Sequence, residues 1–199
     1  MNNTLLSVDL DWLNGSNHPL KELSNLLKYV SNNIPATMTV QHHEFLPTVS
    51  RWIRTGKIPK PFNVINIDQH HDYYLNQPPN HPEGDGINCG MWGFRLPLDW
   101  YDRYTWVHGN QPEICDWDKA QEWLLNHGIY SSGRRYHRLH EFKGNIVAAV
   151  FCISPDYLYP ETGDFIEQII SLVVKHFSLE AVPKLINNDH VLHLSGWGN

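Results

Sequence analysis

Short apolar runs typical of β-strands alternate along this chain with stretches that repeat apolar residues at helical spacing, and this alternation constrains the fold more than any other feature. Strands are predicted over residues 4–8, 36–40, 63–67, 104–107 and 146–153. Helices are predicted over residues 18–33, 45–53, 117–126 and 165–177. Strands and helices in alternation favour a parallel sheet with helices on both faces. The predicted class is therefore α/β, a three-layer sandwich.

Length and charge limit the number of domains and the kind of partner. The chain has 199 residues, which suits one core, and it shows neither an internal repeat nor a linker, so a single domain over residues 1–199 is predicted. The formal net charge is -6, from 15 basic and 21 acidic residues. Nucleic-acid binders usually carry a clustered basic face, so a nucleic-acid partner is not expected. The sequence leaves the oligomeric state open.

The cysteines and the first residues bear on the compartment. Three cysteines without a Cys-x-x-Cys pair indicate neither a disulfide framework nor a thiolate zinc site. The first nine residues lack the basic and apolar regions of a secretory signal. No stretch approaches the roughly 18 apolar residues of a membrane span. We therefore expect a cytoplasmic protein without a membrane partner.

Acidic residues and histidines follow three of the predicted strands. The segments are Val8-Asp9-Leu10-Asp11, Val40-Gln41-His42-His43-Glu44 and Ile67-Asp68-Gln69-His70-His71-Asp72. Ligands of open α/β sheets sit outside the carboxyl ends of the strands, so these groups meet in one crevice if the three strands are neighbours. Alternate residues of an extended segment point the same way, which places Asp68, His70 and Asp72 on one side if the extended form persists.

Several carboxylates packed together need a cation, because mutual repulsion otherwise raises their pKa values. Carboxylates with one or two imidazoles and no thiolate suit Mn²⁺ or a similar ion. Asp68 and Asp9 are placed to bridge two ions, and such a pair generates a hydroxide nucleophile for hydrolysis at neutral pH. Asp9 and Asp11 also have a simpler interpretation, since aspartate at a strand end often caps the next turn.

These segments resemble signatures of the ureohydrolases, the arginase and agmatinase superfamily. Asp68-Gln69-His70-His71-Asp72 resembles Asp-Ala-His-x-Asp, Ser7-Val8-Asp9-Leu10-Asp11 resembles Ser-x-Asp-x-Asp, and His43 falls in a context similar to Asp-His-Ser. The small family that includes the peptide arginases is the most similar. Its Ser-Pro-Glu-Tyr and Cys-Gly-Asn-Trp elements resemble Ser154-Pro155-Asp156-Tyr157 and Cys89-Gly90-Met91-Trp92.

The resemblance implies a role for each matching residue. It implies an arginase-like or deacetylase-like fold in which Asp68 and Asp9 bridge two Mn²⁺ ions. One ion is completed by His43 and Asp72 and the other by His70 and Asp11, although whether His42 or His43 is the ligand stays open. Asp156 would pair with a substrate guanidinium. In arginases Ser-x-Asp-x-Asp follows Asp-x-His-x-Asp, whereas here it precedes it, so a rearranged strand order is implied.

Two further residues complete the candidate site. His81 is the nearest candidate for a proton-shuttling catalytic histidine, and a solvated loop residue is the alternative. Trp92 opens an aromatic-rich segment up to Trp106, which suits either a substrate-binding groove for a peptide or core packing.

The function implied by the resemblance is that of a peptide arginase. Such an enzyme converts arginine in a ribosomally synthesised precursor peptide to ornithine and releases urea. Two alternatives remain. One is a deacetylase-type amide hydrolase with a single metal, and the other is a non-catalytic peptide-binding module stabilised by a metal.

Overall fold

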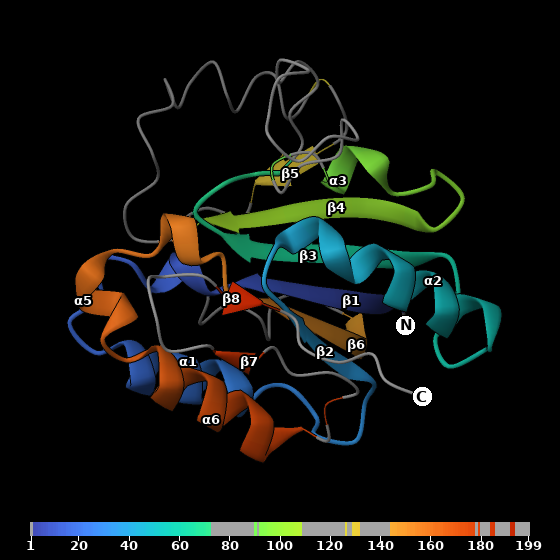
Figure 1. The fold of residues 1–199 in the computed structure, drawn as a ribbon. Helices are drawn as coiled ribbons and strands as arrows, with labels where there is room; N and C mark the ends of the chain where they lie inside the picture. The colour runs from blue at the N-terminus through green and yellow to red at the C-terminus, as the bar shows by residue number, and fades with distance from the viewer. Residues whose placement is uncertain are drawn as a thin grey trace.

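A six-stranded parallel sheet forms the centre of the computed structural model, which describes residues 2–72, 90, 92–108, 126, 129–131, 144–177, 179, 184–185 and 192–193 (Figure 1). The strand order is β2-β6-β1-β3-β4-β5, and every pairing in this sheet is parallel. The strands are β1 (Asn2–Asp9), β2 (Ala36–Thr39), β3 (Phe62–Asp68), β4 (Tyr101–His108), β5 (Ile129–Ser131) and β6 (Gly144–Cys152). A separate antiparallel pair joins β7 (Lys184–Leu185) to β8 (Leu192–His193).

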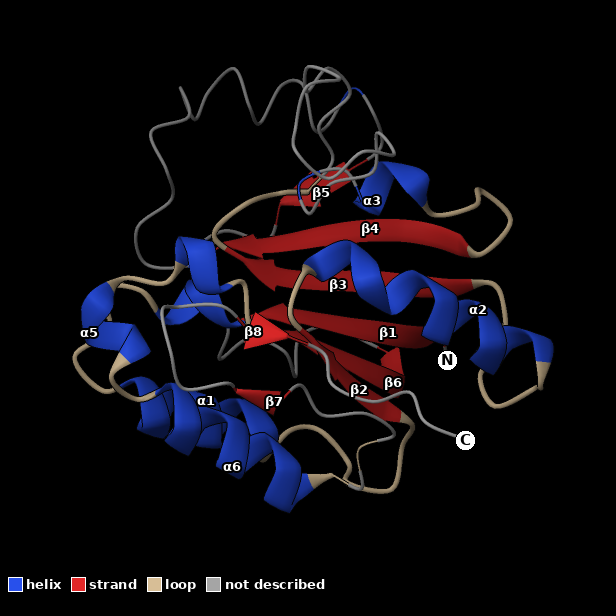
Figure 2. Ribbon diagram, in the orientation of Figure 1, coloured by secondary structure: helices blue, strands red, loops and turns tan. Residues whose placement is uncertain are grey.

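Helices connect the strands of the sheet (Figure 2). The α-helices are α1 (Pro19–Leu27), α2 (Leu46–Arg54), α3 (Trp92–Arg95), α5 (Pro160–Gly163) and α6 (Ile166–His176). Short 3₁₀ helices follow three of the strand ends: η1 (Leu10–Leu13), η2 (His42–Phe45) and η5 (Pro155–Tyr157). None of the helices in the described part of the chain is long and apolar enough to cross a membrane.

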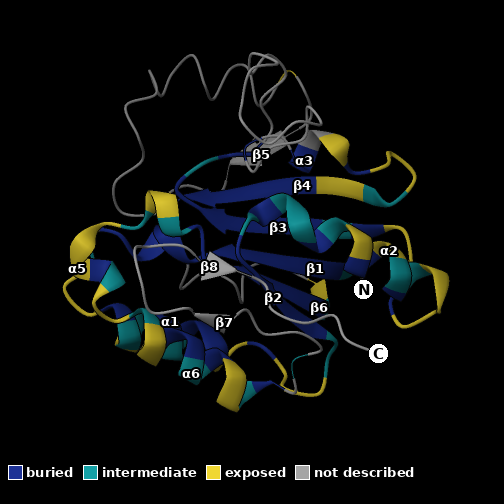
Figure 3. Ribbon diagram, viewed as in Figure 1, coloured by how far each residue is buried: buried dark blue, intermediate teal, exposed yellow. Residues whose placement is uncertain are grey.

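Side chains of successive strand residues enter two different cores, because they point to opposite faces of the sheet. Leu6 and Val8 of β1 pack with α1 and α6, whereas Leu5 packs with α2 on the other face. The carboxyl-terminal halves of β4 and β6 are buried, whereas residues at their starts are exposed (Figure 3). Helices therefore cover both faces, and the predicted α/β class with a parallel sheet is confirmed.

Helix α2 ends where the sequence predicts a stop. Gly56 has φ 71°, a left-handed conformation that glycine adopts without a steric penalty. Its N–H donates to the carbonyl of Ile53, and the N–H of Lys57 donates to the carbonyl of Trp52. This pair of bonds is the Schellman arrangement, which satisfies carbonyls that the helix itself leaves without donors.

The predicted elements match the structure where it describes them, with differences of a few residues at their ends. The predicted helix over residues 117–126 lies outside the described residues, except for residue 126. The aromatic-rich segment serves the core at three positions: Trp92, Tyr104 and Trp106 are each at most 2% exposed. These three side chains pack in the hydrophobic core, as the core-packing alternative predicted.

Candidate metal centre

The candidate site lies at the carboxyl ends of the central strands. Asp9 is the last residue of β1, and Asp68 is the last residue of the adjacent strand β3. The prediction that the ligands converge supposed that the three strands are neighbours. In the structure β2 is not a neighbour of β1, because β6 lies between them. The segment after β6 therefore enters the centre of the site, and the segment after β2 reaches it from the far side.

The first group surrounds the imidazole of His42. Its Nδ1 lies 2.8 Å from an oxygen of Asp72 and 3.2 Å from an oxygen of both Asp9 and Asp68. These three contacts share one nitrogen, and none is a well-directed hydrogen bond. All four side chains are buried, with residues at most 3% exposed. Such an arrangement is more typical of a cation-binding site than of a set of ordinary hydrogen bonds.

The second group combines Asp11, Asp68 and His70. The Nδ1 of His70 lies 3.1 Å from Asp11 Oδ2 and 3.6 Å from Asp68 Oδ1. One ligand atom from each of the three side chains lies within 4.8 Å of the others, as in the group of His42, Asp68 and Asp72. Asp68 belongs to both groups. The carboxylate therefore stands where one residue can serve two ions.

An extended segment after β3 would place its candidate ligands on one side. In the structure this segment does not stay extended. Asp72 has φ 55°, an uncommon left-handed conformation for a residue with a side chain. The turn directs His70 to Asp11 and Asp72 to His42. His70 and Asp72 thus belong to different ligand groups.

His42 enters the cluster, and His43 does not. Gln41 and Glu44 form a capping box at the start of η2, which fixes the turn. Successive side chains of a 3₁₀ helix point about 120° apart, so only one of two adjacent histidines can face the carboxylates. His43 is half-buried and lies in none of the possible ligand groups of the described residues. The geometry therefore favours His42, the alternative that the sequence left open, over His43.

We expect His42→Ala to reduce the amount of Mn²⁺ that the protein binds and His43→Ala to leave it unchanged. His42 Nε2 contacts the hydroxyl of Ser7 at 2.6 Å, which holds the ring with its other nitrogen toward the carboxylates. Isothermal titration with Mn²⁺ measures the stoichiometry. Equal effects of the two substitutions would contradict the assignment of His42.

Two further side chains orient the carboxylates, and a cysteine lies beside them. Ser154, after β6, donates its hydroxyl to Asp9 Oδ2 at 2.5 Å, and Asn66 donates to Asp68 Oδ2 at 3.1 Å. The Cys152 thiol lies close enough to Asp9 and His42 to form a third group of possible ligands. Burial and the nearby Asp9 charge raise the pKa of this thiol, so it is protonated in the structure described. Sequence reasoning named neither Ser154 nor Cys152 as part of the site.

The buried carboxylates and imidazoles shift one another's pKa values. Burial by itself lowers the pKa of His42, but the facing carboxylates outweigh it and raise that pKa well above its usual range. Burial and repulsion by Asp9 and Asp68 raise the pKa of Asp11 well above its usual value. Burial raises the pKa of Asp68 too, but its contacts with His42 and His70 prevail and lower it. The cluster thus requires positive charge at its centre.

His71 has the opposite character. Burial lowers the pKa of His71 to about 4, so its imidazole is neutral at physiological pH. Its ring packs edge-on against Trp106 at a centroid distance of 5.7 Å. Its backbone carbonyl accepts a hydrogen bond from the Tyr104 hydroxyl. These contacts fix the turn between the ligand candidates on either side of it.

Trp92 lies in the interior at 0% exposure and not on an open substrate surface. Its indole N–H donates to Asp72 Oδ2 at 2.5 Å, and its ring lies 4.8 Å from that of His42. This position favours orientation of Asp72 over the substrate contact that the sequence predicted. The exclusion of water by such a ring also strengthens the electrostatic contacts beside it.

Trp92→Phe should weaken Mn²⁺ binding about 10- to 100-fold, because loss of a hydrogen-bonding partner of a metal ligand typically has that effect. Trp52→Phe is the matched control, since Trp52 is equally buried in the same core. Titration calorimetry on both variants measures the difference. A similar affinity for the two would show that the indole of Trp92 has no special role.

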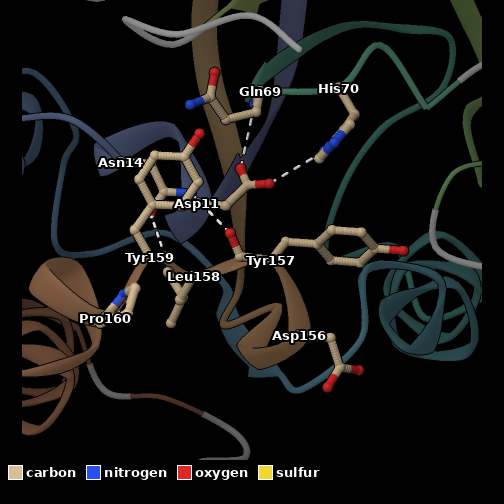
Figure 4. A pocket seen from close by; sticks show the side chains of 9 residues that line it. All are labelled: Asp11, Asn14, Gln69, His70, Asp156, Tyr157, Leu158, Tyr159 and Pro160. Atoms are coloured by element: carbon tan, nitrogen blue, oxygen red, sulfur yellow. Dashed lines mark hydrogen bonds and ion pairs between the residues drawn. The ribbon is translucent and has the colours of Figure 1, made fainter.

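A cavity of about 210 Å³ opens beside the second group (Figure 4). Its lining comprises Asp11, Asn14, Gln69, His70, Asp156, Tyr157, Leu158, Tyr159 and Pro160. Asp156 is exposed at the edge, where its carboxylate accepts a hydrogen bond of 3.4 Å from Gln41 and points away from Asp11 in the view of Figure 4. His81, the predicted proton shuttle, lies outside the described residues.

Comparison of the chain with protein-family models, with curated proteins and with solved structures finds no match.

Proposed function

We propose that this chain is a hydrolase that uses two Mn²⁺ ions to convert arginine in a ribosomally synthesised peptide to ornithine, with release of urea. One observation carries the proposal. Two buried groups of carboxylates and imidazoles share Asp68 at the carboxyl edge of a parallel sheet. The resemblance of the same residues to ureohydrolase signatures supplies the choice of substrate.

The donor set fits the proposed ions. His42, Asp9, Asp68 and Asp72 would hold one ion, and Asp11, Asp68 and His70 the other, with Asp9 adjacent to both. Oxygen donors with one imidazole in each group suit Mn²⁺. When bound, such ions lower the pKa of water and stabilise negative charge in the transition state. Burial and repulsion between carboxylates raise the pKa of Asp72 and Asp11, and a bound cation would remove this penalty.

The chain's own residues would hold and orient the substrate. In the reaction, the oxygen of water forms a bond to the guanidinium carbon. The bond from that carbon to the side-chain nitrogen breaks, and this nitrogen takes up a proton as ornithine leaves. The carboxylate of Asp156 is exposed, so it has room to turn toward the cavity and accept charge-assisted hydrogen bonds from the guanidinium. Ser7, Ser154 and Trp92 would keep the ligands aligned throughout.

Two ligand groups favour this proposal over its enzymatic alternative. A deacetylase-type hydrolase needs one metal, whereas the shared position of Asp68 suits two. The alternatives differ in product. A single bound ion with release of acetate from acetyl-lysine peptides would favour the deacetylase. Metal-loaded, folded protein that yields no product with either class of peptide would favour the binding module.

The decisive experiment incubates the full chain and Mn²⁺ with a panel of arginine-containing peptides. Mass spectrometry would detect the loss expected for conversion of arginine to ornithine, and a colorimetric assay would detect urea. Peptides that carry citrulline in place of arginine serve as substrate controls. Absence of both signals across the panel, with two ions bound, would refute the proposal.

A further inference from the structure

Two tyrosines that have no role in the proposal so far line the cavity. Tyr157 is 36% exposed and Tyr159 is 41% exposed. Both lie in the segment from Ser154 to Pro160, here called the rim loop. In Figure 4 their rings stand on opposite sides of the Asp11 carboxylate.

The rim loop is fixed at three points. Ser154 at its start is bonded to Asp9. The buried Asn14 donates its amide to the carbonyl of Tyr157 at 2.7 Å and accepts from the N–H of Tyr159 at 2.9 Å. Leu158, between the tyrosines, packs against the hydrophobic core. The backbone that carries the two rings is therefore held in position before any ligand arrives, which reduces the entropy lost on binding.

The floor of the cavity is acidic, and its walls are aromatic. Asp11 lines the same cavity as the two rings, and in the view of Figure 4 its carboxylate projects between them; His70 meets the ring of Tyr157 edge-on at 5.2 Å. Asp156 adds a second carboxylate at the edge. A cation attracted by such carboxylates would lie against ring faces, where the aromatic quadrupole binds it further. Guanidinium is planar and stacks on rings, whereas the ammonium of lysine is compact and strongly hydrated.

The size of the cavity indicates how much of a ligand it encloses. Pockets that enclose whole small molecules usually measure about 300–1,000 Å³. At about 210 Å³ this cavity suits a single side chain and leaves the rest of the ligand outside, on the exposed tyrosine edges.

We propose that Tyr157 and Tyr159 form an aromatic clamp that takes the arginine side chain of a peptide, with the peptide backbone lying outside on the rim loop. The two tyrosines then determine specificity, selecting a planar cation on a polypeptide over lysine and over free arginine. This inference rests on the proposed function for its substrate, and it adds the residues that recognise that substrate.

The test measures peptide affinity by calorimetry on the full chain, both with chelator and with Mn²⁺. The probe is a short arginine peptide, compared with free arginine and with the same peptide containing lysine or citrulline. We expect Tyr157→Leu and Tyr159→Leu each to weaken binding of the arginine peptide about three- to tenfold, and the corresponding phenylalanine variants to retain it. Tyr29→Leu is the matched control, because Tyr29 is 52% exposed and does not line the cavity.

The outcomes separate recognition from hydrolysis. No binding to either form of the chain, equal binding of the leucine variants, or equal affinity for the citrulline peptide would overturn the clamp. If binding is selective for arginine and needs both rings, but no urea forms in the separate assay, the result would support the clamp and refute the proposed hydrolase activity. Urea release that is unchanged in KM and kcat by both leucine substitutions would support the hydrolase and remove the clamp.

Discussion

Asp68→Asn is expected to abolish urea formation and to prevent the binding of both Mn²⁺ ions. The carboxylate belongs to both ligand groups, and its two oxygens face different histidines. An amide of the same shape has only one oxygen and no charge, so neither ion keeps its full set. Loss of an orienting partner alone reduces affinity or activity about 10- to 100-fold, and loss of a shared ligand should exceed that range.

The fold should survive this substitution. Asparagine retains the volume of Asp68, which matters because the side chain is fully buried. Asp99→Asn is the control, since this carboxylate is exposed and pairs with Lys60 on the surface. Urea assays, calorimetry with Mn²⁺ and circular dichroism on both variants provide the comparison. An Asp68→Asn protein with undiminished turnover would contradict the role of the shared carboxylate.

Addition of Mn²⁺ should raise the midpoint of thermal unfolding by about 5–10 °C for each site at a free concentration about 100 times its Kd. At that ratio a bound ligand adds about 2.7 kcal/mol to the free energy of unfolding. A domain of this size gains about 2–4 °C per kcal/mol. The gain arises because Asp9, Asp11, Asp68 and Asp72 are buried together and repel one another without a cation.

Differential scanning calorimetry with Mn²⁺ and then with excess chelator measures this shift. The chelator should return the midpoint to its initial value. His42→Ala should show about half of the shift, because it retains the second group. A midpoint that is unaffected by millimolar Mn²⁺ would mean that the clustered carboxylates hold no ion.

Five of the six strands of the sheet could be predicted because their signals are local, whereas the short β5 was not predicted. Strands β1, β3 and β6 are apolar runs, and helices α1 and α6 carry apolar residues at helical spacing. The order of the strands could not be predicted, because it depends on pairings between distant segments. The parallel pairing of Asp9 with Cys152, for example, joins residues from opposite ends of the sequence.

The candidate ligands were predictable for the same reason and to the same extent. Asp9, Asp11, Asp68, His70 and Asp72 directly follow or end strands, and the structure brings all of them together. The choice of His42 over His43 depends on the turn of η2. The spacing of Gln41 and Glu44 was a readable signal for that turn, since it is the pattern of a capping box.

The orienting residues were out of reach of sequence reasoning. Trp92 contacts Asp72 across 20 positions of the chain, and Ser154 contacts Asp9 across 145. No periodicity relates such residues, and only the three-dimensional packing of the strand ends brings them together. Ser154 did fall within a recognised motif, although that motif pointed to its neighbour Asp156.

Ser154 gives the molecule a direct mechanical connection. With φ 45°, it holds an uncommon backbone conformation at the exit from β6, and its hydroxyl reaches Asp9 while its chain continues into the tyrosines. An ion bound by Asp9 would therefore also act on the rim loop, where we propose that the peptide binds. By thermodynamic linkage, if bound cations raise the affinity for the peptide, the bound peptide raises the affinity for the cations by the same factor.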